Sequence, residues 1–139
     1  MKGIEQTASI AVAEDNPPRR ISIVDDDASI REALKSLMRS VRFDVEAFAS
    51  AEDFLASKHL NDSACLILDV SLPGMSGFEL QARLKQERPG LPIIFITAHA
   101  DEVSRERALK SGAVELLAKP VRRDTLFKAI QAAFEREAK

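Results

Sequence analysis

The stretch that decides the fold reads Cys65-Leu-Ile-Leu-Asp69-Val-Ser-Leu-Pro73-Gly74, an unbroken apolar run followed by an acid and a turn. Consecutive apolar residues, as opposed to alternating apolar and polar ones, are typical of a strand that is covered on both faces of a parallel sheet. The proline and glycine then indicate a turn. Asp69 therefore stands at the carboxyl end of a predicted central strand.

Four more apolar runs lie along the chain, at residues 21–24, 45–48, 93–96 and 114–117. The stretches between them carry apolar residues at helical spacing, most clearly the stripe from Ile30 to Val41. Five predicted strands that alternate strictly with five predicted helices indicate right-handed βαβ crossovers and an open, doubly wound parallel sheet of the α/β class. The other helices are predicted around residues 54–55, 80–84, 103–110 and 126–134.

The composition is that of one globular domain with no need of disulfides. Of the 139 residues, 45% are hydrophobic and 30% are charged, and the net charge is only −2. So small a charge does not indicate nucleic-acid or membrane binding, and no run approaches the ~20 apolar residues that span a bilayer. The chain also lacks a signal-peptide pattern, so we expect a cytoplasmic protein. Cys65, the single cysteine, is predicted to be a buried thiol.

The start of the chain differs from the rest. Residues 1–19 are small, polar and aperiodic, and they include the run Asn16-Pro17-Pro18. Consecutive prolines disfavour a helix, because each lacks a backbone N–H and restricts the residue before it. We therefore predict a flexible N-terminal leader over residues 1–19 and one domain over residues 20–139.

Polar residues follow four of the predicted strands at the point where each strand ends. The ends carry Asp25-Asp26-Asp27, Asp69, Thr97 and Lys119-Pro120. In a parallel sheet these ends share one edge, and ligands bind at that edge in doubly wound folds. The residues predicted to converge on one site are Asp25, Asp26, Asp69, Thr97 and Lys119.

The predicted chemistry of this edge is phosphoryl transfer. Several carboxylates in one cleft repel one another and need a cation, and hard oxygen ligands suit Mg²⁺. A carboxylate beside the metal can act as a nucleophile, while a hydroxyl and an ammonium can stabilise the phosphoryl oxygens. Each residue alone also has an ordinary role: Asp27 as a helix cap, Asp69 in a turn, Thr97 in a loop and Lys119 as a surface charge. Their joint placement at strand ends favours a phosphoacceptor site.

These residues also carry a resemblance to a known family. Over residues 20–138 the chain resembles the receiver domain of bacterial response regulators, which act in two-component phosphorelays. The resemblance implies a flavodoxin-like (βα)5 fold whose five strands lie in the order 2-1-3-4-5. The matching segments are Ile23-Val-Asp25-Asp26-Asp27, Leu66-Ile-Leu-Asp69-Val-Ser-Leu-Pro73-Gly-Met-Ser-Gly77, Ile93-Ile-Phe-Ile-Thr97-Ala98 and Gly112-Ala-Val-Glu-Leu-Leu-Ala-Lys119-Pro120.

The resemblance implies a role for each acidic residue. Asp69 would accept a phosphoryl group from a sensor histidine kinase or a histidine phosphotransfer protein. Asp25, Asp26 and Asp69 would hold Mg²⁺, with the backbone carbonyl of Ser71 as a further ligand. Ser71 and His99 each lie two residues past a site residue, so both are candidates for tuning dephosphorylation. The alternative for His99 is an ordinary exposed loop histidine.

The resemblance also implies a switch. Thr97 would hydrogen-bond the phosphoryl group and shift on phosphorylation, and Lys119 would form an ion pair with the phosphoryl group. In this family Pro120 typically follows a cis peptide bond, which would aim Lys119 into the cleft. Receivers commonly carry Tyr or Phe three residues before this lysine as a rotating switch side chain, but this chain has Leu116 there.

The sequence at residues 50–55 and 96–101 resembles that of the FixJ/NarL-type branch, whose members usually continue into a helix-turn-helix domain. The sequence stops at Lys139, so two interpretations stay open: a stand-alone receiver, or the truncated receiver half of a transcriptional regulator. In either case we expect no nucleic-acid binding by this chain itself. The branch also implies a phosphorylation-dependent homodimer through the fourth helix, the fifth strand and the fifth helix.

Three rival functions fit parts of the pattern. A phosphatase of the haloacid-dehalogenase type would need a second Asp where this chain has Ser71. A flavodoxin-like electron carrier would need a hydroxyl-rich phosphate loop and aromatic rings, but the first strand ends in three carboxylates and the chain has no Trp or Tyr. A phosphorylation-independent scaffold is disfavoured by the complete set of acids, threonine and lysine. We expect a phosphoacceptor that catalyses its own phosphorylation and dephosphorylation, and not a turnover enzyme.

Overall fold

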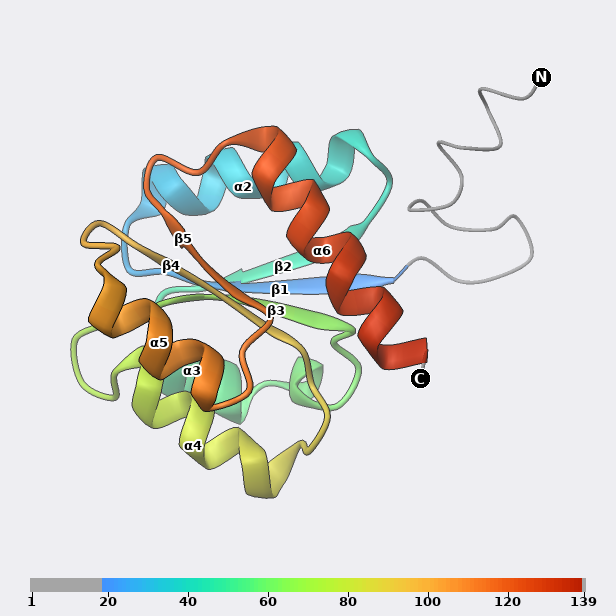
Figure 1. The fold of residues 1–139 in the computed structure, drawn as a ribbon. Helices are drawn as coiled ribbons and strands as arrows, with labels where there is room; N and C mark the ends of the chain where they lie inside the picture. Colours follow the sequence, from blue (N-terminus) through green and yellow to red (C-terminus); the bar gives the residue numbers. More distant parts are fainter. Residues whose placement is uncertain (1–18, 139) are drawn as a thin grey trace.

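A five-stranded parallel sheet forms the centre of the computed structural model, which describes residues 19–138 (Figure 1). The strands are β1 (Arg20–Val24), β2 (Asp44–Phe48), β3 (Cys65–Asp69), β4 (Ile93–Thr97) and β5 (Glu115–Ala118). They lie in the order β2-β1-β3-β4-β5, which confirms the expected α/β fold and its strand order. Residues 1–18 of the predicted leader lie outside the described residues.

Helices cover both faces of this sheet (Figure 1). One face is covered by α2 (Ala28–Ser40) and α6 (Arg123–Ala138), and the other by α3 (Ala51–Ala56), α4 (Gly77–Glu87) and α5 (Glu102–Lys110). All five predicted helices are therefore present. The sequence did not indicate the short 3-10 helix η1 (Lys58–Leu60), which begins where the Ser57 hydroxyl accepts a hydrogen bond from the His59 amide.

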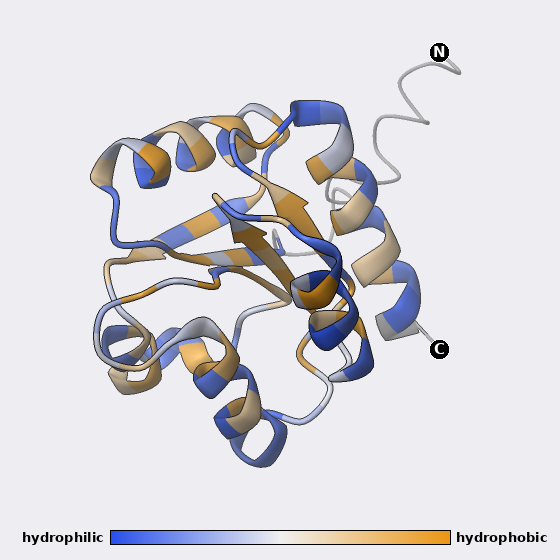
Figure 2. Cartoon of the chain, turned by 60° about the vertical axis from the view of Figure 1, so that its left-hand side comes forward, coloured by the Kyte–Doolittle hydropathy of each residue, from blue (hydrophilic) through white to orange (hydrophobic). Residues whose placement is uncertain are grey.

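The apolar runs form the most deeply buried part of the molecule. β3 and β4 are buried along their whole length, as expected for central strands of a doubly wound sheet. Figure 2 shows hydrophobic strands at the centre and helices whose outer faces carry hydrophilic residues. One apolar core lies between the sheet and α2 and α6, and a second lies between the sheet and α3, α4 and α5. Cys65 is fully buried in the first core, as predicted.

Two helix starts flank the edge of the sheet that carries the acids. Asp27 caps α2, because its carboxylate accepts hydrogen bonds from the amides of Ser29 and Ile30. The ordinary role considered for Asp27 is thus confirmed. Ser76 and Glu79 form a reciprocal capping box at the start of α4.

Gly77 allows α4 to begin close to the end of β3. A Cβ atom at this buried glycine would lie 2.3 Å from the carbonyl oxygen of Asp69 and 2.9 Å from the Cα atom of Val70. Both atoms belong to the backbone and cannot move aside. Any side chain at position 77 would therefore displace either the helix or the acid at the strand end.

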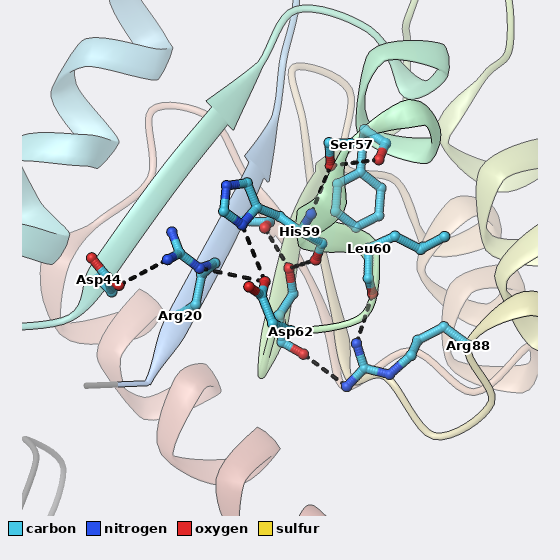
Figure 3. Close-up of polar contacts among 10 residues, drawn as sticks. Arg20, Asp44, Ser57, His59, Leu60, Asp62 and Arg88 are labelled. Carbon is cyan, nitrogen blue, oxygen red and sulfur yellow. Dashed lines mark hydrogen bonds and ion pairs between the residues drawn. The ribbon is translucent and has the colours of Figure 1, made fainter. Parts of the chain in front are cut away.

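The amino-terminal edge of the sheet carries a separate set of polar contacts (Figure 3). The Arg20 guanidinium lies 3.0 Å from the Asp44 carboxylate and 3.4 Å from that of Asp62, which also lies 3.2 Å from Nδ1 of His59. Both carboxylates are about half exposed, and exposed ion pairs contribute about 0–1 kcal/mol each. These contacts join η1 to β1 and β2 and have an ordinary structural role.

Arg88 makes the second contact at this edge. Its guanidinium donates 2.8 Å hydrogen bonds to the carbonyl oxygens of Leu60 and Ser63, as Figure 3 shows for Leu60. The hydroxyl of Ser63 is hydrogen-bonded to the hydroxyl of Ser22 in the sheet. The end of α4 is thereby tied to the segment before β3, on the side of the molecule opposite the acids.

Candidate functional site

The register of the sheet brings two buried carboxylates together. β1 and β3 pair with Val24 opposite Leu68, so Asp25 and Asp69, the next residue of each segment, lie side by side. Asp25 is 0% exposed and Asp69 is 4% exposed, whereas Asp26 is exposed. Ligand atoms of these three residues all lie within 4.8 Å of one another. The acids that were predicted to converge therefore form one cluster.

Lys119 places its ammonium group between the two buried acids. Nζ lies 2.8 Å from Oδ2 of Asp25 and 3.0 Å from Oδ2 of Asp69. The Lys119–Pro120 peptide bond is cis, as expected, and the backbone amide of Lys119 donates to the carbonyl of Thr97. The sequence predicted that this lysine enters the cleft, but it did not predict that Asp25 would be its second partner.

Burial and charge compete in setting the pKa values of this group. Desolvation raises the pKa of Asp69 above its ordinary value, with a smaller contribution from the Asp25 charge, while Lys119 and the Ser71 amide act in the opposite direction. Burial alone would lower the pKa of Lys119, but the carboxylates of Asp25 and Asp69 together raise it. Lys119 is therefore held as an ammonium, which suits a group that faces anions.

The donor atoms of the cluster fit a divalent cation. Oδ2 of Asp25 is buried and accepts no hydrogen bond of ordinary geometry from the described residues, although Lys119 Nζ lies 2.8 Å away as an ion-pair partner. A buried carboxylate oxygen with so little hydrogen bonding is free to coordinate a metal ion. The set consists of hard oxygen atoms from a few carboxylates, one of them exposed, which is the pattern that Mg²⁺ favours.

Backbone contacts hold the acids in place. Oδ1 of Asp25 accepts a 2.8 Å hydrogen bond from the Asp27 amide, and Oδ1 of Asp69 accepts a 3.0 Å bond from the Ser71 amide. The sequence analysis missed Arg31, which donates a 2.7 Å bond to the carbonyl oxygen of Asp25. Its position four residues after the cap of α2 was the available signal, since that spacing points the side chain back toward the helix start.

The other predicted residues surround the cluster. Thr97 is 3% exposed at the end of β4, and its hydroxyl accepts a 3.1 Å hydrogen bond from the amide of exposed His99. Among residues 19–138, no hydrogen bond joins the Thr97 hydroxyl to Asp69 or Lys119. Leu116 is buried in β5, paired with Phe95, and Ser71 is exposed just past β3.

A comparison with known protein families matches residues 21–131 to the response regulator receiver domain. The chain belongs to this family. Receiver domains belong to two-component response regulators, and phosphoryl acceptance is their general function. They typically bind Mg²⁺ at an acidic pocket and interact with histidine kinases or phosphotransfer proteins.

Individual relatives agree with this assignment. Nodulation protein W of Bradyrhizobium diazoefficiens is 45% identical over 86% of this chain and 52% of its own length. The transcriptional regulatory protein FixJ of the same organism is 37% identical over 81% of this chain and 55% of its own length. A solved structure of the response regulator StyR has a TM-score of 0.79 and 43% identity, covering 88% of this chain and 62% of that one.

The chain spans about half the length of the curated relatives that it matches. Within residues 19–138, the structure contains no helix that is both long and apolar enough to cross a membrane.

Mg²⁺ should stabilise this domain, because the ion relieves repulsion among Asp25, Asp26 and Asp69. By mass action the gain is about 2.7 kcal/mol when the Mg²⁺ concentration is 100 times the dissociation constant. Asp26→Asn should weaken the effect, since it removes one charge and the amide is a poorer ligand. Thermal unfolding of chelator-treated protein, followed by circular dichroism with and without Mg²⁺, measures both effects.

Asp53→Asn provides the matched control, because this aspartate is exposed on α3 and lies outside the cluster. It should respond to Mg²⁺ as the wild type does. A melting temperature of the wild type that does not change with millimolar Mg²⁺ would contradict the metal site.

Proposed function

We propose that this chain accepts a phosphoryl group on Asp69 from the phosphohistidine of a sensor histidine kinase or a phosphotransfer protein. One observation carries the proposal: Lys119 Nζ lies 3.0 Å from Asp69 within a cluster whose three acids can share a cation. A nucleophilic carboxylate, a fixed ammonium and a metal-binding acid pair are the groups that phosphoryl transfer requires.

In the proposed reaction a carboxylate oxygen of Asp69 attacks the phosphorus atom and forms an O–P bond. The N–P bond of the phosphohistidine breaks, and its electron pair stays on the imidazole nitrogen. Lys119 neutralises a phosphoryl oxygen, and Asp25, Asp26 and the backbone carbonyl of Ser71 would hold Mg²⁺. When bound, Mg²⁺ supplies further positive charge to the phosphoryl oxygens. The acyl phosphate is then hydrolysed, so the domain acts as a timed switch and not as a turnover enzyme.

The proposed switch starts at Thr97. Its hydroxyl, which accepts from the His99 amide, would shift toward the phosphoryl group to donate its own hydrogen, and this shift would strain or break the bond from His99. The same loop reaches α5 through two further hydrogen bonds, from the Asp101 amide to the His99 carbonyl and from the Ser104 amide to the Asp101 carboxylate. Movement of the hydroxyl would therefore loosen the segment that caps α5.

The first test is of the acceptor itself. A small phosphodonor with Mg²⁺ should add the mass of one phosphoryl group to the wild type, measured by intact-mass spectrometry. Asp69→Asn and Asp69→Ala should abolish the addition, because neither an amide nor a methyl group can serve as the nucleophile. Asp53→Asn is the control and should be labelled normally. Undiminished labelling of both Asp69 variants would place the acceptor elsewhere.

The second test concerns the lifetime of the acyl phosphate. His99 and Ser71 are exposed next to the cluster, so their side chains can influence how water reaches the phosphoryl group. His99→Ala and Ser71→Ala should change the decay rate severalfold and leave labelling intact. His59, the only other histidine in the sequence, lies at the opposite edge of the sheet. The acyl phosphate of His59→Ala should therefore decay at the wild-type rate. Equal decay in all four proteins would leave His99 and Ser71 without a role.

The third test concerns whether phosphorylation drives a two-fold dimer through α5, β5 and α6. These are the fourth helix, fifth strand and fifth helix through which the resemblance to this branch implies a homodimer. Val103 is 77% exposed and Leu109 is 37% exposed, both on α5, among charges of both signs that a two-fold contact can match. Arg105 of α5 already pairs with Glu115 of β5 at 2.9 Å, which ties these two elements together. We expect weak coupling to phosphorylation, about 1–3 kcal/mol.

Sedimentation velocity with and without beryllofluoride measures this coupling. The wild type should dimerise more strongly with the phosphoryl mimic, and Val103→Ser should reduce the dimer while leaving labelling intact. A wild type that stays monomeric in both states would remove the dimer switch. The better proposal would then be a monomeric phosphoryl carrier or docking partner. A partner domain that follows in a longer regulator would be controlled through the same face.

A further inference from the structure

The loop between β3 and α4, residues 70–76, carries Ser71 and is fixed at both ends by backbone contacts. The Val70 amide donates a 3.0 Å hydrogen bond to the carbonyl of Ile96, and the Gly77 amide donates a 3.0 Å bond to the carbonyl of Val70. The close approach of Gly77 to Asp69 fixes the far end as well. These contacts leave the middle of the loop, around Gly74, to be held by something else.

Glu52 of α3 makes the contact in the middle of the loop. Its Oε2 atom accepts a 3.0 Å hydrogen bond from the Met75 amide. Among residues 19–138, no other side chain from outside β3, the loop and α4 hydrogen-bonds the backbone of this loop. The bond from Met75 lowers the pKa of Glu52, which means that the charged carboxylate is the form that binds the amide.

Gly74 makes room for this carboxylate. A Cβ atom at Gly74 would lie 2.8 Å from Oε2 of Glu52, and the residue has a φ of +74°, a conformation that favours glycine. The loop thus has both the backbone shape and the empty space that the Glu52 contact needs.

α3 is a firm base for the contact, although Glu52 itself is exposed. Ala51 and Phe54, on either side of Glu52, are 0% exposed and belong to the same apolar core as Leu72 of the loop. Ser50 caps the helix by accepting a hydrogen bond from the Asp53 amide. The packed core therefore fixes the helix that carries Glu52. The hydrogen bond from the Met75 amide to Glu52 then fixes the loop relative to that helix.

We infer that Glu52 is a positioning residue for the metal site: it holds loop 70–76 so that the Ser71 carbonyl can join Asp25, Asp26 and Asp69 in binding Mg²⁺. The inference rests on the proposed function, because it assigns Glu52 a part in the same site. Glu52 does not touch the metal or the phosphoryl group. Its loss leaves the three acids in place and frees only the carbonyl ligand.

The test compares Glu52→Ala with Glu52→Gln, whose side-chain carbonyl can still accept from the Met75 amide. Asp53→Ala is the control on the same helix, since its backbone amide still donates to the Ser50 cap whatever its side chain. Nuclear magnetic resonance gives two readouts: hydrogen exchange of the Met75 amide in metal-free protein, and the Mg²⁺ dissociation constant from a titration with Mg²⁺ alone. Circular dichroism with urea checks that each variant is folded.

We expect Glu52→Ala to lose protection of the Met75 amide and to bind Mg²⁺ about tenfold more weakly, the lower end of the effect of removing a residue that orients a metal ligand. Glu52→Gln should recover most of both properties, and Asp53→Ala should match the wild type. Wild-type Mg²⁺ affinity in Glu52→Ala, with protection of Met75 lost, would overturn the inference and leave the proposed function standing. Absence of Mg²⁺ binding by the wild type would overturn both.

A second variant perturbs the same contact from the loop side and serves if Glu52→Ala is poorly folded. Gly74→Ala should push the carboxylate away and weaken Mg²⁺ binding, as Glu52→Ala does. Gly90→Ala is its control, because Gly90 also has a positive φ, +90°, but a Cβ atom there would meet nothing within 4 Å. Gly90→Ala should therefore cost stability through backbone strain alone and leave Mg²⁺ affinity unchanged. Equal Mg²⁺ affinity of the two glycine variants would count against the role of Glu52.

Discussion

The whole site depends on the enforced proximity of two buried carboxylates, Asp25 and Asp69. The parallel register of β1 and β3 leaves them no freedom to separate, because each directly follows a residue that is paired in the sheet. Burying two carboxylates side by side opposes folding: the pKa of Asp69 is raised mainly by desolvation and to a smaller extent by the Asp25 charge. Lys119, the residue that follows β5, offsets part of this repulsion because its ammonium group reaches both acids.

A single ammonium group cannot fully satisfy two carboxylates. Oδ2 of Asp25 remains without a well-formed hydrogen bond, and Asp26 adds a third negative charge at the rim. A site with more negative charge than its own lysine offsets suits an external cation, and in the proposed reaction that cation would offset the charge of the phosphoryl group. For the proposed reaction, stability and function are thus opposed at this edge, since the charges that phosphoryl transfer would use also repel one another in the metal-free fold.

The sequence predicted the parts of the structure that follow from periodicity. Asp25, Asp69, Thr97 and Lys119 could be placed together because each ends an apolar run, and the carboxyl ends of parallel strands share one edge. The strand order came from the family resemblance, and β5 is Glu115–Ala118, one residue later than its apolar run. The contact of Arg31 with the Asp25 carbonyl was missed although helical spacing from the α2 cap pointed to it. The contact of Glu52 with Met75 could not be predicted, because it joins a side chain to the backbone of another segment and leaves no periodic trace in the sequence.

In the proposed switch, Leu116 would limit how a signal travels from this site to the surface. At this position receivers commonly carry an aromatic side chain that rotates between buried and exposed positions, but Leu116 is only 4% exposed and packs in the core that includes Phe95. Moving this buried aliphatic side chain into water would cost about 1.5–3 kcal/mol, so we expect it to have no exposed state of comparable energy. The proposed switch would then use residues 98–101, where three hydrogen bonds connect the Thr97 hydroxyl to the first turn of α5. Such bonds contribute only about 0.5–1.5 kcal/mol each. A switch built from them would therefore shift the populations of the resting and switched conformations modestly, and would not convert one fully into the other.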